Sequence, residues 1–543
     1  MTRLVATRYP ASERREAITM SLFSAQLYPG RALGFLVLGA SLHDIITRLK
    51  AEPQRFPKLD LGYYGDPVKE PVLLTLPANG LRLRFDGAEQ RLRLVEVVDF
   101  TKNHIFLKPA NDKERDLVRP PSTQDGAAQQ HDAAAGPTFR HIYQRFLGPT
   151  YDGEYIPNAE SRDGSGDYVL SYPGVAFTFP MRASQYEHSK DVVSLISSTA
   201  IPTAMAVFSG DSWTQAQNQL WTEVLPSIKT FAPLSKGKDN CPDEVSLVRI
   251  HGGGKVQLFR RWTNSSFWIH LGDTTPQQLV TELGPPDAIY RKNDQRMYIH
   301  KLRAVSNTMA QRPNGNDLKR FDDLTDTDQS SAHTTSDGYD SNDDAIEDDL
   351  VANVSGECFW NYFHLGFDIL VSTPTNPSQP PPSQGANSGI PEVQFKSFSA
   401  DRLVATKVIL HANVPGSYPF NRHRRCRWEI PYLSNTNPNA AIDSETSFPD
   451  IETSLREEWK SIYASEEEAR QKQRGMVLNR GWGDSPGSSC ELLGGWEESG
   501  STTTPGVGKK FDGSEDSTTT LYGFPGLVFE VLKNGYVSAV TVF

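Results

Sequence analysis

The sequence has few cysteines and no long apolar run. Four cysteines occur among 543 residues, and none is spaced as Cys-x-x-Cys or clustered with histidines at zinc-binding spacing. This usage predicts a reducing compartment, the cytosol or the nucleus, and no metal site. No apolar stretch approaches the ~20 residues that a membrane helix requires, and residues 1–20 lack the apolar segment of a secretory signal. We therefore expect a cytoplasmic protein whose contact with membranes is peripheral or made through a partner.

The sequence also lacks recognisable catalytic motifs. Neither Gly-x-Ser-x-Gly nor His-Glu-x-x-His occurs. The segment His251-Gly-Gly-Gly-Lys255 is too short between its glycines for a phosphate-binding loop and is followed by Val256, so we interpret it as a tight hairpin turn. We expect a protein that is not an enzyme and that uses no cofactor and no small-molecule substrate. A hydrolase with an unrecognised site is the less favoured alternative.

Negative charge is concentrated in one segment. The formal net charge is −11, and residues 317–349 alone contribute −10, so the rest of the chain is nearly neutral. A nearly neutral folded part gives no reason to expect nucleic-acid binding. We interpret the acidic segment as a solvated spacer, and the alternatives are a docking segment or a phosphorylation tract.

One helical pattern occurs three times. Ser41, Thr138 and Thr275 each precede apolar residues at four, five and eight positions further on, which indicates a capped helix with one apolar face. The second and third copies end at Leu147-Gly148-Pro149 and Leu283-Gly284-Pro285. Glycine followed by proline is typical of a helix C-terminus. The repetition predicts a unit that is used several times.

Strand patterns follow the predicted helices. Four segments open with glycine and continue with apolar residues at nearly every second position, which predicts strands with one buried face: 80–85, 174–179, 366–370 and 526–531. Partner strands are expected downstream, at 92–99, 201–208, 404–411 and 536–543. The fourth unit has a less distinct helix, around 448–463. The pattern predicts a β-rich α+β fold of tandem degenerate units, each with one capped helix and antiparallel strands.

Segments of biased composition separate these units. They cannot bury enough apolar surface to fold, so we expect them to be disordered. The predicted disordered segments are an N-terminal extension at 1–27 and inserts at 111–137, 303–352, 374–391 and 484–520. The helix–strand units are then expected at 28–110, 138–270, 271–432 and 433–543, with two inserts interrupting the third unit and one the fourth.

The strongest candidate for an interaction surface is a short basic run. Arg422, Arg424, Arg425 and Arg427 could meet an acidic partner or anionic lipid headgroups. The alternative is an ordinary strand at 422–430, whose apolar residues face the interior and whose solvated face carries Arg425 and Arg427. The two interpretations are compatible with each other.

Several of these segments together resemble the phagophore assembly factor family, a conserved eukaryotic family of autophagy factors. The most specific stretch is His411-Ala-Asn-Val-Pro-Gly-Ser-Tyr-Pro-Phe-Asn421, which runs into Arg425-Cys426. Further matching stretches are Gly80–Asp86, Gln90–Asp99, Gly148–Tyr155, Gly174–Phe179, Leu283–Pro286, Asn361–Leu370 and Phe529–Val531. The matches are colinear and skip the inserts.

The resemblance implies a non-enzymatic autophagy adaptor. Members pair with a large WD-repeat β-propeller protein, and the complex associates with the phagophore assembly site through phosphoinositide recognition by the propeller. The family has also been linked to Golgi-derived trafficking. A Golgi-derived membrane trafficking factor, or a module that binds anionic lipid directly, is therefore the alternative function. The resemblance carries over no catalytic residues.

Overall fold

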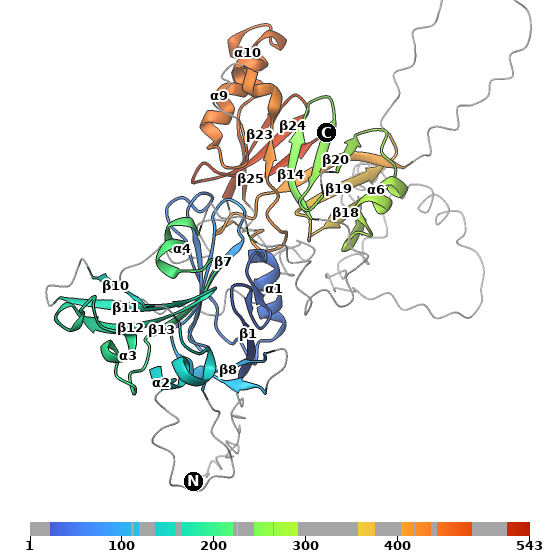
Figure 1. The fold of residues 1–543 in the computed structure, drawn as a ribbon. Coiled ribbons are helices and arrows are strands. Elements are labelled where there is room, and N and C mark those ends of the chain that lie inside the picture. Colours follow the sequence, from blue (N-terminus) through green and yellow to red (C-terminus); the bar gives the residue numbers. More distant parts are fainter. Residues whose placement is uncertain are drawn as a thin grey trace, which may run out of the picture.

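The computed structural model contains two lobes that follow one another in the sequence (Figure 1). We call residues 22–225 the first lobe and residues 244–543 the second lobe. The structure describes residues 22–109, 113–118, 136–150, 152–158, 164–220, 225, 244–263, 265–291, 357–374, 403–417, 419–435, 442–479 and 518–543. The predicted insert at 303–352 lies wholly outside these residues, and the other predicted inserts and the N-terminal extension lie largely outside them.

The first lobe is built on an eight-stranded antiparallel sheet with the order β10-β11-β12-β13-β7-β6-β5-β4. Its strands are β4 (Asp60–Gly62), β5 (Val72–Leu76), β6 (Leu81–Phe85), β7 (Leu92–Val97), β10 (Glu154–Pro157), β11 (Ser165–Tyr172), β12 (Val175–Arg182) and β13 (Ala204–Val207). A smaller sheet shares its core and has the order β3-β2-β1-β8-β9. The strands of that sheet are β1 (Phe23–Tyr28), β2 (Ala32–Leu33), β3 (Leu36–Val37), β8 (Asn103–Leu107) and β9 (Arg115–Asp116).

The second lobe contains a corresponding pair of sheets. Its eight-stranded sheet has the order β17-β18-β19-β20-β25-β24-β23-β22. The strands are β17 (Ala288–Arg291), β18 (Cys358–Tyr362), β19 (Phe367–Ser372), β20 (Val404–His411), β22 (Met476–Asn479), β23 (Thr518–Phe524), β24 (Leu527–Leu532) and β25 (Val537–Val542). The smaller sheet has the order β16-β15-β14-β21, with β14 (Val245–Ile250), β15 (Lys255–Arg260), β16 (Ser266–His270) and β21 (Trp428–Glu429).

The two lobes have the same topology. Each begins with a three-stranded meander, continues with a helix and a four-stranded meander, and ends with a second helix and a second four-stranded meander. Between the two halves of each lobe one strand returns parallel to the first strand: β8 lies parallel to β1, and β21 lies parallel to β14. The two meanders join through their last strands, β7 with β13 and β20 with β25. The chain therefore consists of two tandem copies of one module, and each module holds two helix–strand units.

A helix precedes each four-stranded meander. These helices are α1 (Leu42–Ala51), α2 (Phe139–His141) continued by the π-helix η2 (Ile142–Phe146), α6 (Pro276–Leu283) and α9 (Phe448–Glu458). The predicted caps are confirmed, because the hydroxyl oxygens of Ser41, Thr138 and Thr275 accept hydrogen bonds from backbone N–H groups in the first helical turn. Gly148 and Gly284 after the second and third helices have φ angles of 97° and 82°.

Each lobe also contains shorter helices and 3-10 turns. They are α3 (Val192–Leu195), α4 (Trp213–Gln219) and α10 (Glu466–Lys472), with the 3-10 turns η1 (Phe100–Lys102), η3 (Ala183–Gln185), η6 (Pro431–Asn435) and η7 (Lys460–Ile462). No helix in the described parts of the chain is both long and apolar enough to span a bilayer.

Each lobe has its own hydrophobic core. In the first lobe the apolar face of α1, with Ile45, Ile46 and Leu49, packs on the sheets, and in the second lobe Leu279 of α6 and Ile451 of α9 do the same. Burying one such aliphatic side chain contributes about 1.5–3 kcal/mol. The helices therefore dock through the apolar stripe that the sequence pattern predicted.

The structure confirms the β-rich fold of repeated units but corrects several predicted boundaries. β1 begins at Phe23, inside the predicted extension at 1–27, and β23 begins at Thr518, inside the predicted insert at 484–520. β14 to β16 belong to the core of the second lobe, although the sequence pattern assigned them to the second unit at 138–270. Each unit also has four strands rather than two. The two additional strands precede the predicted pair in each unit, and in the second lobe long segments separate some partners, as between β17 and β18.

Candidate functional site at the junction of the lobes

The two modules differ by the additional strand β9 of the first lobe and in the link between their halves. In the first lobe residues 98–102 join β7 to β8, whereas in the second lobe residues 412–427 join β20 to β21. We call residues 412–427 the connector. Its Phe420 packs against the hydrophobic core of the first lobe, and its Ala412 and Val414 form a small apolar cluster with Val68. The connector thus belongs to the second lobe in sequence but also packs on the first.

The backbone at this junction is unusual. Gln90, Asn413 and Asn421 have φ angles of 52°, 47° and 62°, and they are the only non-glycine residues with positive φ in the described ranges. Such conformations cost about 1–3 kcal/mol each and concentrate at functional sites. Here side-chain hydrogen bonds hold them. Asn413 Nδ2 donates to Gln90 Oε1 at 2.9 Å, Gln90 Nε2 donates to the Asn413 carbonyl at 2.8 Å, and the Asn421 N–H donates to Asn413 Oδ1 at 2.7 Å.

Arg424 anchors the connector to the first helix of the chain. Its guanidinium donates to the carboxylate of Asp44 in the first turn of α1, and its Nη1 lies 3.2 Å from Glu244 Oε1. Arg91, which precedes β7, reaches the other oxygen of Glu244 at 3.0 Å. Glu244, at the start of the second lobe, is thus held between an arginine of each lobe. Because a buried charge without a partner is very costly, these pairs fix the position of the connector.

Arg425 joins the connector to the turn between β6 and β7. Its Nε donates to the carbonyl of Ala88 at 2.6 Å and its Nη1 donates to the carbonyl of Ala412 at 2.9 Å. Its Nη2 lies 3.5 Å from Glu445 of the second lobe. One planar guanidinium therefore holds three acceptors from both lobes, which a lysine could not do in the same geometry.

Arg427 and Arg261 complete the network. Arg427 Nη2 contacts Glu445 at 2.8 Å and its Nη1 lies 3.6 Å from Glu89, whose carboxylate also accepts from Arg261 at 2.9 Å. Glu89 lies in the turn between β6 and β7, so these contacts again cross between the lobes. The network brings five arginines together with four carboxylates, so its formal net charge is +1.

The carboxyl groups of the network are held in their charged form. Burial alone raises the pKa of Glu244, but the charges of Arg424 and Arg91 outweigh burial and hold the pKa below its ordinary value. The same balance holds at the other three carboxyls. Burial raises the pKa of Asp44, Glu89 and Glu445. The neighbouring arginines (Arg424, Arg261 and Arg427, in that order) outweigh burial, so each pKa is lowered. All of them are therefore anionic at neutral pH.

The structure buries two of the four arginines that were candidates for an interaction or lipid-binding surface. Arg424 and Arg425 are 8% and 6% exposed, so the expectation that Arg425 lies on a solvated face is wrong. Arg427 is half-buried against Glu445, and the half-buried Arg422 lies with its guanidinium 5.9 Å from the ring centroid of Phe363. The predicted strand at 422–430 is reduced to β21, although its apolar residues Cys426, Trp428 and Ile430 are buried as expected.

Sequence reasoning missed the acidic half of the junction. Asp44, Glu89, Glu244 and Glu445 lie far apart in the sequence, and no local pattern relates them to the basic run. One sequence signal was available, in the segment between His411 and Asn421. This segment contains Asn, Pro, Gly and aromatic residues but lacks the alternating apolar pattern of a strand, which favours a loop held by particular contacts.

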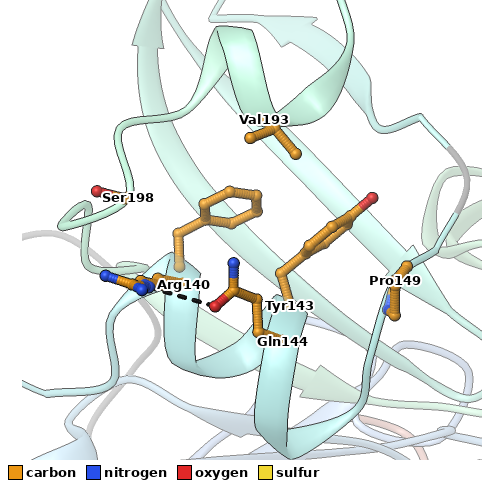
Figure 2. A pocket seen from close by; sticks show the side chains of 7 residues that line it. Arg140, Tyr143, Gln144, Pro149, Val193 and Ser198 are labelled. Carbon is orange, nitrogen blue, oxygen red and sulfur yellow. Dashed lines mark hydrogen bonds between the residues drawn. The ribbon is translucent and has the colours of Figure 1, made fainter.

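A separate hollow lies beside the second helix of the first lobe. It has a volume of about 460 Å³ and is lined by Phe139, Arg140, Tyr143, Gln144, Pro149, Val193 and Ser198 (Figure 2). Arg140 Nε donates to Gln144 Oε1 at 3.2 Å across one side of it. The hollow is open and mainly apolar, and its lining contains no pair of groups suited to acid–base chemistry.

Comparison with known proteins covers both lobes and the connector. The model of the phagosome assembly factor 1 family matches residues 32–315 and 397–543. A PHAF1 protein of Arabidopsis thaliana is 22% identical over 537 residues, which cover 98% of this chain and 95% of the relative. A PHAF1 protein of Drosophila melanogaster is 21% identical, covering 88% and 84%, and one of Caenorhabditis elegans is 21% identical, covering 75% and 77%. No solved structure gives a significant match. The chain therefore belongs to the phagosome assembly factor 1 family.

Proposed function

We propose that this chain is a non-enzymatic autophagy adaptor that works as a subunit of a complex with a WD-repeat β-propeller protein. In this proposal the complex associates with the phagophore assembly site, and the chain itself is cytoplasmic and peripherally recruited. The observation that carries the proposal is the match to the phagosome assembly factor 1 family across both lobes. The junction supports the proposal, because the segment that resembles the family most specifically, residues 411–421, packs on both lobes and joins them.

The eight-stranded sheet of the second lobe offers the first surface to test for partner binding. Among the described strands its edge strand β22 pairs with β23 alone, and its Met476 and Val477 are 67% and 68% exposed. An open edge with exposed apolar side chains can accept a further strand or a sheet-rich partner. A β-propeller is built of four-stranded blades whose remaining edges are short.

A direct lipid-binding function has less support. The basic run that suggested it is occupied by carboxylates of the same chain, and only Arg422 and Arg427 keep part of their surface exposed. Recruitment to a phosphoinositide membrane is therefore assigned to the partner in this proposal.

The test is reconstitution of the complex from purified components. The full chain and a WD-repeat propeller protein that copurifies with it from cells are mixed and separated by gel filtration. We expect one complex that Val477→Lys weakens at least tenfold, whereas Glu467→Lys on the exposed face of α10 leaves it unchanged. Absence of any WD-repeat protein from the purified material, together with normal autophagic flux in cells that lack the chain, would rule the proposal out.

A further inference from the structure

Three side chains from separate segments meet at the base of the connector. Asp368 lies in β19, His411 ends β20, and His423 lies within the connector itself. His411 Nε2 is 2.9 Å from Asp368 Oδ2, and His423 Nε2 is 2.8 Å from Asp368 Oδ1. The two imidazole rings are stacked with centroids 3.8 Å apart, so both Nε2 atoms face the same carboxylate.

Among the residues that the structure describes, no arginine or lysine pairs with the carboxylate of this cluster. Asp368 is 7% exposed, and its side-chain partners are the two imidazoles and the amide of Asn361, whose Nδ2 donates to Oδ1 at 2.8 Å. Each carboxylate of the junction network, by contrast, contacts an arginine. The nearby Arg422 lies over the rings of Phe363 and Tyr290. A buried carboxylate requires a compensating charge, because the interior solvates it poorly.

The hydrogen bonding of the cluster is also incomplete with protein groups alone. Within the part of the chain that the structure describes, Nδ1 of His411, Nδ1 of His423 and Oδ1 of Asn361 are buried and have no hydrogen-bond partner. His423 is only 2% exposed. Each Nδ1 atom lies across its ring from the Nε2 atom that faces Asp368, so an ion held by the Nε2 atoms leaves it free for a bound water, the outer partner that a metal-bound histidine needs.

We propose that Asp368, His411 and His423 bind a divalent transition-metal ion, for which Zn²⁺ is the best match, and that the ion closes the base of the connector. Two neutral imidazole nitrogens and one carboxylate are a common three-residue zinc set, and water occupies the fourth position. Tetrahedral zinc holds neighbouring donor atoms about 3.3 Å apart, so the present Nε2–O contacts must open by about half an ångström and the stacked rings must rotate until both Nε2 lone pairs point at the ion. Asn361 then orients the coordinating carboxylate.

The consequence is mechanical. His411 and His423 stand twelve positions apart and bracket the residues that pack on the first lobe. An ion that holds both histidines against β19 fixes the connector as a closed loop. Metal binding then strengthens the contact between the lobes without adding a direct bond to the first lobe.

The test uses the full chain after removal of metals with a chelator. Zn²⁺ and Co²⁺ are titrated separately, and the bound metal is measured by calorimetry and by elemental analysis after dialysis. We expect one Zn²⁺ per chain, a melting temperature that rises with Zn²⁺, and a Co²⁺ spectrum without thiolate charge-transfer bands. Asp368→Asn and His423→Ala weaken Zn²⁺ binding by at least about 100-fold.

Two control variants separate this cluster from other possible ligands. His104, with Glu114 and Asp116, forms a second group of potential donors in the first lobe, and His364 pairs with Asp287 near the surface. His104→Ala and His364→Ala retain Zn²⁺ binding if the proposal is right. Binding that survives Asp368→Asn, or that disappears in His104→Ala, overturns it, as does a wild-type chain that binds no Zn²⁺. If Asp368→Asn fails to fold, a wild-type crystal soaked in Zn²⁺ decides, because an anomalous peak away from His411 and His423 contradicts the site.

Discussion

The two lobes share one topology and differ in the link between their halves. In the first lobe, five residues at 98–102 carry the chain from β7 to β8 and stay close to their own sheet. In the second lobe the equivalent link is the connector, which leaves its own sheet and packs on the first lobe. A duplicated module thus becomes one body through the extension of a single loop. The comparison shows that residues 411–421, the stretch that resembles the family most specifically, lie where the two modules differ.

The interiors of the two regions also differ in kind. Each lobe is held by an apolar core, whereas the junction combines a small apolar cluster with a network of arginines, carboxylates and amide side chains. Apolar cores tolerate changes of pH, and buried ion pairs do not. Perturbing the charges should therefore separate the lobes before either lobe unfolds.

Acidification should have the largest effect, because it weakens the junction while leaving the two apolar cores intact. The pKa values of Asp44, Glu89, Glu244 and Glu445 are lowered in the folded state, so their stabilisation is complete above the ordinary carboxyl pKa and is lost as pH falls through the folded values. We expect stability to be constant from neutral pH down to about pH 5 and to fall steeply below about pH 4, beginning at the junction. Hydrogen exchange measured at a series of pH values would locate the loss, and uniform loss in both cores would contradict the account.

Replacement of Arg425 by alanine should have the next largest effect. The change leaves Glu445 with Arg427 as its remaining arginine and removes the donor of the Ala88 and Ala412 carbonyl oxygens, and each unsatisfied acceptor costs about 1–3 kcal/mol. Urea denaturation measures the change in the free energy of unfolding. The matched control is Arg470→Ala in α10, which removes an exposed pair with Glu466 and should cost under about 0.5 kcal/mol. Equal effects of the two changes would contradict a buried, structural role for Arg425.

Replacement of Gly366 by alanine should be somewhat milder. Gly366 has a φ of 91°, and an added Cβ would lie 2.4 Å from the carbonyl oxygen of Arg424, so the connector must shift. We expect a loss of about 2–3 kcal/mol, with faster hydrogen exchange in the connector. Gly253 also has positive φ but has open space around it, so Gly253→Ala should cost only about 1 kcal/mol. Similar losses at the two glycines would show that the close approach of the connector is unimportant.

Removal of a helix cap should have the smallest effect and should be the same in both copies. Ser41 and Thr275 cap the first helices of the two modules with equivalent hydrogen bonds. Each change to alanine should lower the free energy of unfolding by about 1 kcal/mol, as measured by urea denaturation. A much larger loss in one lobe would mean that the modules are not energetically equivalent.

The repeated unit could be predicted from the sequence because its signals are local. The caps at Ser41, Thr138 and Thr275 and the strand pairs β6–β7, β19–β20 and β24–β25 depend on residues close together in the chain. The parallel pairings of β1 with β8 and of β14 with β21 join residues that are far apart, and no local pattern encodes them.

The junction could not be predicted from local patterns for the same reason. A basic run has the same sequence pattern whether its arginines are solvated or paired, and the difference depends on carboxylates such as Asp44 and Glu244 that the fold brings in from a distance. Sequence patterns did not reveal the cluster of Asp368, His411 and His423, because two of these residues lie in different strands and the third lies in a loop. Spacing rules detect only ligands that lie close together in sequence.

The central claim is that the connector makes two copies of one module unfold as a single cooperative body. Native-state hydrogen exchange of the slowest amides in β6 and in β24 tests it most directly, since each strand reports the opening of its own lobe. We predict equal opening free energies for the two strands in the wild-type chain and clearly different values in Arg425→Ala. Unequal values already in the wild type, or equal values in the variant, would contradict the claim.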